Sequence, residues 1–344
     1  MDEIRSEVSQ LGEFGLIDRI KSKFTLGNKT SLTGIGDDAA VIDVGDDCLL
    51  VSTDMLVEGI HFDLSYVPIQ HLGYKAVAVN VSDIAAMNAT AEQITVSIAL
   101  SNRFSVEAID ALYAGIRAAC QSYKVDLVGG DTTSSASGLI ISITVLGRAK
   151  KHKVVYRNGA RVNDILCVTG DLGAAFLGLQ VLEREKAVFI ADPSMEPGLD
   201  NYEYIVGRQL KPDGRTDIIF DLEEAGVIPT AMIDVSDGLA SDLLHISRQS
   251  GVGFRIYDDK IPIDNMTFET AIEFKLDPIT CALNGGEDYE LMFTITKEDQ
   301  EKLKNHPDIH FIGYAHDRRD LNVLVTKEGN IVPLKAQGWD HFRS

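Results

Sequence analysis

The 344-residue chain alternates short β-branched and apolar runs with longer segments in which apolar residues recur at helical spacing. The first half contains three runs that predict strands, because they are rich in β-branched residues and end at turn-forming residues. It also contains two segments with helical periodicity, the second of them preceded by Ser105 as a possible N-cap. The strands are expected at Cys48–Ser52, Ile94–Leu100 and Leu139–Gly147, and the helices within His71–Met87 and over Val106–Tyr123.

A basic stretch at 148–153 interrupts this pattern, and we place a domain boundary there. The expected domains are 1–150 and 151–344, about two domains being usual for this length. The second half repeats the alternation, so each half is predicted to be an α/β or α+β layer structure. Its expected elements are strands at Asp164–Thr169, Gly253–Tyr257 and Leu291–Ile295, a helix over Ala174–Glu185, a helix beginning near Ser241, and an ordered loop region with three prolines at 191–214.

The formal net charge of -20 changes the functional picture. It argues against nucleic acid and anionic membranes as partners, because both need basic protein surface. The four cysteines show no metal-binding spacing, and neither a signal peptide nor a membrane span is recognisable, so a reduced, cytoplasmic protein is expected. Excess acid can simply keep a protein soluble; alternatively, it can hold metal ions that bridge the protein to an anionic substrate.

Five acidic clusters favour the second interpretation. Each is flanked by glycine or small residues, and most follow a short apolar run, so we expect their carboxylates where strands end and loops begin. Crowded carboxylates repel one another unless a cation neutralises them, and Mg²⁺ is usually held by a few carboxylates plus substrate phosphates. The clusters are Gly36–Ala40, Ser52–Asp54, Asn80–Asp83, Gly129–Thr132 and Asp234–Gly238.

Each cluster by itself has a plainer explanation. A polar turn, a helix cap or a packing segment would account for any one of them. Gly34–Ala39 matches the dinucleotide pattern G-x-G-x-x-A, but its two acidic residues would face the pyrophosphate, so we reject a Rossmann site. The chain has no P-loop, no protein-kinase motif set and no nucleophile elbow, which favours metal-assisted phosphoryl chemistry.

Taken together and in this order, the motifs resemble the thiamine-monophosphate kinase family. The resemblance covers almost the whole chain and is specific because the motifs occur in sequence, although 186–213 matches none of them. It rests on Gly12–Ile17, Gly34–Ala39, Ser52–Asp54 with His61–Phe62, Ala78–Met87, Gly129–Thr133, Asp234–Leu239, Gly285–Leu291 and Gly338–Phe342.

The resemblance implies a two-domain fold like that of the aminoimidazole-ribonucleotide synthetase group, with an N-terminal domain that forms a homodimer and a C-terminal α/β domain beside it. It also implies the last step of thiamine diphosphate synthesis, in which ATP phosphorylates thiamine monophosphate with several Mg²⁺ ions; a need for K⁺ stays open. The implied metal ligands are Asp38, Ser52, Thr53, Asp54, Asp83, Asp131, Asp234 and Asp237, with Asp54, Asp131 and Asp237 positioning the reacting phosphates. The implied ATP contacts are Tyr113, Gly130, Asp131, Arg157 and Ser236, and the implied thiamine monophosphate contacts are His61, Glu287 and Trp339.

Direct in-line transfer would need no catalytic acid or base, because the attacking phosphate oxygen is already ionised. Two alternatives remain: another ATP-using synthetase of the same superfamily, or a non-catalytic metal or nucleotide sensor. A selenophosphate synthetase would be expected to carry a cysteine or selenocysteine near its N-terminus, and 1–27 contains no cysteine.

Overall fold

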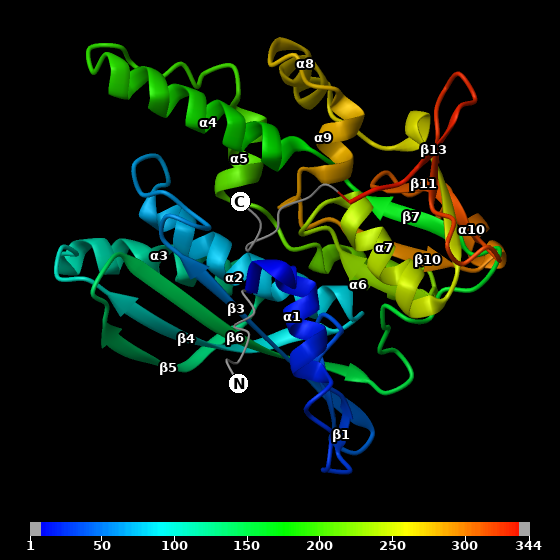
Figure 1. Ribbon diagram of the computed structural model, residues 1–344. Coiled ribbons are helices and arrows are strands. Elements are labelled where there is room, and N and C mark those ends of the chain that lie inside the picture. The colour runs from blue at the N-terminus through cyan, green and yellow to red at the C-terminus, as the bar shows by residue number, and fades with distance from the viewer. Residues whose placement is uncertain (1–7, 337–344) are drawn as a thin grey trace, which may run out of the picture.

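The computed structural model describes residues 8–336 and contains two β-sheets with helices packed against them (Figure 1). The first sheet has six strands in the order β1-β2-β3-β6-β4-β5. All of its neighbouring pairs are antiparallel except β4 and β5, which are parallel. The strands are β1 (Ser31–Thr33), β2 (Ala40–Asp43), β3 (Asp47–Val57), β4 (Thr90–Leu100), β5 (Asp126–Ser134) and β6 (Leu139–Lys150).

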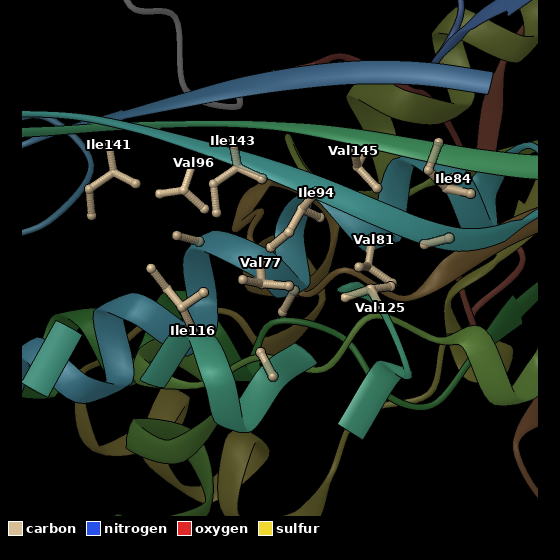
Figure 2. Close-up of a cluster of buried hydrophobic side chains, with 14 of the residues drawn as sticks. Val77, Val81, Ile84, Ile94, Val96, Ile116, Val125, Ile141, Ile143 and Val145 are labelled. Carbon is tan, nitrogen blue, oxygen red and sulfur yellow. The ribbon is translucent and has the colours of Figure 1, made fainter. Parts of the chain in front are cut away.

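One face of this sheet is covered by two long helices, α2 (Ile69–Ala86) and α3 (Val106–Tyr123), as Figures 1 and 2 show. Apolar side chains at alternate strand positions pack against them, as expected for a sheet with one buried face. Val77 of α2, Ile94 of β4 and Ile143 of β6 are fully buried in this layer. The helices cross at close range because Gly73 and Gly115 lie at their contact, where a Cβ atom would meet a backbone oxygen of the other helix at 2.1 and 1.8 Å.

The second sheet has seven strands in the order β13-β12-β9-β11-β7-β10-β8. Its pairs are antiparallel except for β9 and β12. Its strands are β7 (Ile165–Thr169), β8 (Ala231–Asp234), β9 (Gly253–Tyr257), β10 (Leu291–Ile295), β11 (Ile309–His316), β12 (Val323–Val325) and β13 (Ile331–Pro333).

Helices cover both faces of the second sheet. The remaining helices are α1 (Gly12–Lys21), α4 (Ala174–Ala191), α5 (Glu203–Leu210), α6 (Thr216–Glu224), α7 (Leu239–Ser250), α8 (Asn265–Glu273), α9 (Pro278–Asn284) and α10 (Lys297–Leu303), with 3₁₀ turns η1 (Val8–Gln10) and η2 (Asp258–Lys260). Side chains of α7 and α9 share one hydrophobic cluster with the sheet, and those of α6 and α10 share another. The second cluster also contains Ala85 and Ala86 of α2, so α2 lies between the two sheets.

The central position of α2 explains its composition. Most of its residues are buried, which is typical of a helix that is packed on all sides. Its buried polar residues therefore need partners inside the protein. They are Lys75, Asn80 and Ser82, and all three have such partners, described below.

The strand and helix predictions agree with the structure in many places and differ in a few. Helix α3 has the predicted bounds, and the Ser105 side chain accepts a hydrogen bond from the backbone N–H of Ala108. The region 191–214 is not only loop, because it contains α5. The acidic clusters differ most: Ser52–Asp54 lies inside β3, Asp83 inside α2 and Gly129–Asp131 inside β5, so most of them are not at strand ends.

Candidate active site

Four carboxylates from distant parts of the chain converge between the two sheets. Carboxylate oxygens of Asp38, Asp83 and Asp234 lie within 4.8 Å of one another. Asp38 precedes β2, Asp83 is on α2 and Asp234 ends β8, where it is 2% exposed. Asp54 of β3 adds its negative charge to the same group. We call these four residues the acidic cluster.

The local pattern of β3 explains how Asp54 reaches this place. Alternate residues of β3 face α2, and they read Cys48, Leu50, Ser52, Asp54 and Leu56. Ser52 and Asp54 thus take core-facing positions that would otherwise be apolar. The Ser52 hydroxyl donates to Asp83 Oδ2 at 2.6 Å, and the backbone N–H of Asp54 donates to Asn80 Oδ1 at 3.2 Å.

Hydrogen bonds hold the other members of the acidic cluster in place. The Ser82 hydroxyl donates to Asp234 Oδ2 at 2.6 Å. Arg157 donates two hydrogen bonds to Asp38, from Nε to Oδ2 at 3.1 Å and from Nη2 to Oδ1 at 2.5 Å. This forked contact uses two of the five N–H donors of the guanidinium, so the others can reach a phosphate.

Burial and mutual repulsion raise the pKa values of these carboxyl groups. Burial, Asp54 and Asp234 raise the pKa of Asp83 well above its usual range. Burial and Asp38 raise the pKa of Asp234 to about 7. Asp37, beside the acidic cluster, has its pKa raised to about 7 by burial and by Asp38. A divalent cation among these oxygens would remove the repulsion and favour the ionised forms.

A loop beside the acidic cluster carries Glu287, one of the three residues expected to contact the acceptor. Gly286, Glu287 and Tyr289 all have positive φ angles, of 72°, 58° and 53°. Such a backbone is unusual for a residue other than glycine, and it often occurs at functional sites. Backbone hydrogen bonds from Glu287 N to Ser236 O and from Tyr289 N to Val235 O tie this loop to the end of β8.

The loop that follows β8 is held by a residue that the motif analysis did not single out. The backbone N–H groups of Ser236 and Asp237 both donate to Asp242 Oδ2 of α7, at 3.1 and 3.2 Å. Asp242 is 2% exposed, so this contact fixes the loop from inside the protein. The only sequence signal for Asp242 is an acid in the first turn of a helix, which is a common position for a cap.

The predicted site residues do not all meet within one chain. The side chain of Thr53 points to the opposite face of the sheet from Asp54, where it donates to Ile143 O and accepts from Thr144. Asp131 lies on edge strand β5. It pairs with Ser97 of β4, which pairs with Ser142 of β6, which in turn pairs with Met55 of β3. Paired residues share a face, so Asp131 is on the face away from Asp54 and three strand spacings from Met55, about 14 Å.

Two more predicted nucleotide contacts lie toward the β5 edge of the sheet and not beside the acidic cluster. Gly130 is in the same strand, where a Cβ atom would meet Val96 O at 1.8 Å. Tyr113 of α3 lines a cavity of about 650 Å³ together with residues of β5. The predicted residues thus form two groups, one around the acidic cluster and one at the β5 edge. Trp339 lies outside the described residues.

His61 is at the beginning of the loop that follows β3. Its Nδ1 accepts a hydrogen bond from the backbone N–H of Val57 at 3.1 Å, which places the proton of the neutral ring on Nε2.

Within residues 8–336, no helix combines the length and the apolar character that crossing a membrane requires.

Comparisons with known proteins relate the chain to one enzyme family. Residues 36–149 match the family model for AIR synthase related protein, N-terminal domain. Thiamine-monophosphate kinase of Aquifex aeolicus is 35% identical over 336 residues, which span 97% of this chain and 99% of that protein. The Bacillus subtilis enzyme of the same name is 34% identical and matched over its full length. The chain belongs to the thiamine-monophosphate kinase family.

Solved structures of this family have the same architecture. The structure of AaThiL complexed with AMPPCP and TMP superposes with a TM-score of 0.82 at 32% identity, covering 98% of this chain and 100% of that one. The fold extends beyond the family: the hydrogenase maturation protein HypE in complex with ATP superposes with a TM-score of 0.69 at 19% identity. The expected α/β fold of the synthetase group is thereby confirmed.

Proposed function

We propose that this protein transfers the γ-phosphoryl group of ATP to the phosphate of thiamine monophosphate, releasing ADP and thiamine diphosphate. The observation that carries the proposal is the convergence of Asp38, Asp54, Asp83 and Asp234 from four separate segments of the chain. The family relatives carry the same activity in their name, and one related structure holds both AMPPCP and TMP.

The donor set fits Mg²⁺. It consists of carboxylate oxygens, which are the hard ligands that this ion prefers. Asp38, Asp83 and Asp234 are the residues that would hold it, with Asp54 and the Ser52 hydroxyl beside them and Asp237 three residues after Asp234 in the chain. When bound, Mg²⁺ supplies positive charge that screens two anionic reactants from each other and stabilises the charge on the transferred group.

The protein itself contributes position and electrostatic support. In the transfer, an ionised oxygen of the acceptor phosphate forms a bond to the γ-phosphorus while the bond to the ADP oxygen breaks. The attacking oxygen carries no proton, so no general base is required. The free donors of Arg157 are placed to contact phosphate oxygens, and packing holds the oxygens of the acidic cluster in fixed positions.

The homodimer is a further part of this proposal. The α2 and α3 helices cover the other face of the first sheet and leave open the face that carries Met55 and Asp131, and Met55 is 56% exposed. Asp131 and Tyr113 cannot join the acidic cluster of their own chain, because they lie at the far edge of the sheet. A second copy seated on this face would cover Met55 and Asp131, so Asp131 would lie at the interface between the subunits.

The test is ADP release from ATP in the presence of Mg²⁺, with and without thiamine monophosphate. We expect release that depends on the acceptor, and thiamine diphosphate in equal amount. Asp54→Ala is expected to abolish it while the protein stays folded. ATP turnover only with a different acceptor would favour a sister synthetase, and nucleotide binding without any turnover would favour a sensor.

A further inference from the structure

A buried cation of α2 lies outside the roles described so far. The Lys75 side chain is 5% exposed. Its ammonium donates to the backbone oxygen of Gln209 at 3.0 Å and pairs with Glu287 Oε1 at 3.1 Å. Lysine is almost never fully buried unless it is paired, so this position needs an explanation.

Gln209 belongs to the stretch 186–213, which matches no family motif. Gln209 is in the last turn of α5 and is 6% exposed. Its Nε2 donates to Glu287 Oε2 at 2.7 Å. The two oxygens of the Glu287 carboxylate are therefore held by two different helices, one by α2 and one by α5.

The other atom of the Gln209 amide is an acceptor without a donor. Gln209 Oε1 is buried and receives no hydrogen bond from any side chain or backbone group among residues 8–336. The amide orientation is determined by Glu287, because a carboxylate can only accept. A buried acceptor left unpaired is costly, and such groups often belong to binding sites. Glu287 and Gln209 Oε1 together form a pair of acceptors.

Glu287 itself is held in an unusual conformation. Its backbone is at φ 58°, and its N–H is bonded to Ser236 O at 2.7 Å, next to the acidic cluster. Its side chain is still 32% exposed. A carboxylate has about four lone-pair sites. Lys75 and Gln209 use two of them, so the others can accept from a ligand.

Resting on the proposed function, we infer that Lys75 and Gln209 are positioning residues that hold Glu287 for the ring end of the acceptor. Thiamine monophosphate carries a thiazolium cation and an exocyclic amine on its pyrimidine ring. Both suit a fixed carboxylate beside an amide oxygen that lacks a donor. The trio Lys75–Glu287–Gln209 thus selects a cationic, amino-bearing ring, while the acidic cluster serves the phosphates.

A purely structural role is the competing explanation, since the trio also ties α2 to α5. The two roles differ in what a substitution changes. A structural tie affects stability and both substrates alike. A positioning role affects the KM for thiamine monophosphate but leaves the KM for ATP unchanged.

The test compares Lys75→Met and Gln209→Leu with Lys211→Met. Lys211 is the matched control, because it is two residues from Gln209 and packs over the Tyr74 ring at 4.3 Å without touching Glu287. Steady-state kinetics gives both KM values and kcat, calorimetry without ATP gives the Kd for thiamine monophosphate, and a thermal melt checks folding.

We expect Lys75→Met and Gln209→Leu each to raise the KM and Kd for thiamine monophosphate about 10-fold, the effect of losing one charge-assisted hydrogen bond. The KM for ATP should stay within about 2-fold, as should all constants of Lys211→Met. The double variant should raise the KM and Kd for thiamine monophosphate by less than the product of the two single increases, because both substitutions act through Glu287. If Lys75→Met does not fold, Gln209→Leu decides the question alone.

Several results would overturn the inference. One is an unchanged Kd for thiamine monophosphate in a folded Gln209→Leu variant; another is an equal rise in both KM values. Binding of thiamine monophosphate without turnover in the wild type would reject the proposed kinase reaction, yet the Kd comparison would still decide the role of the trio. A wild type that does not bind this ligand at all would reject both.

Discussion

Neutralising one member of the acidic cluster should stabilise the metal-free protein, and Asp234→Asn is the sharpest case. Asp234 is 2% exposed, and its pKa is raised from 3.8 to about 7 by burial and by Asp38. Between these values the folded chain holds a proton that the unfolded chain has lost. Stability therefore falls as the pH rises through this window, and the full cost is present above about pH 7.

The magnitude follows from the size of the shift. Roughly three pKa units at about 1.4 kcal/mol each give an upper bound of about 4 kcal/mol at pH 8. Because protonating one carboxylate relieves its neighbours, we expect a gain of about 2–4 kcal/mol for Asp234→Asn. Asparagine keeps an oxygen that can accept from the Ser82 hydroxyl. At about 2 °C per kcal/mol for a chain of this size, Tm should rise by about 4–8 °C.

The assay is thermal unfolding in EDTA at pH 8 and pH 5, with Asp110→Asn as a control at an exposed position of α3. The gain of Asp234→Asn at pH 5 should be less than half of that at pH 8, and the control should show none. Added Mg²⁺ should raise the Tm of the wild type more than that of the variant. A lower Tm for Asp234→Asn at pH 8 without metal, or an equal Mg²⁺ response, would refute the reasoning.

The remaining predictions concern activity and assembly. Asp131→Ala should abolish turnover without lowering Tm, and wild-type kcat in this folded variant would remove Asp131 from the site. Arg157→Met should raise the KM for ATP roughly 10-fold or more through lost phosphate contacts, whereas an unchanged KM would confine Arg157 to its pairing with Asp38. Met55→Asp should convert a dimer to monomers in sedimentation experiments, because it places charge at the centre of the open sheet face; a variant that remains dimeric would move the interface elsewhere.

Local patterns predicted much of the secondary structure. Helix α3 and strands β9 and β10 have the predicted bounds, because a capped amphipathic helix and short apolar strands are determined by neighbouring residues. The same reasoning placed the acidic clusters at strand ends, which is wrong for Ser52–Asp54 and for Asp83. Ser52 and Asp54 interrupt an apolar run, which is typical of the end of a strand. In the structure the strand continues, and the two residues take core-facing positions opposite Asn80 and Asp83 of α2.

The sequence alone determined which chemistry is available: many carboxylates, small residues beside them, and motifs in the order of one family. It could not determine which carboxylates meet, because that depends on strand register and on the packing of α2 between two sheets. The tertiary structure decided that Asp38, Asp54, Asp83 and Asp234 converge while Asp131 lies across the sheet. It also joined Lys75 and Gln209 to Glu287. Contacts between residues that are distant in the chain arise from packing and leave no local pattern in the sequence.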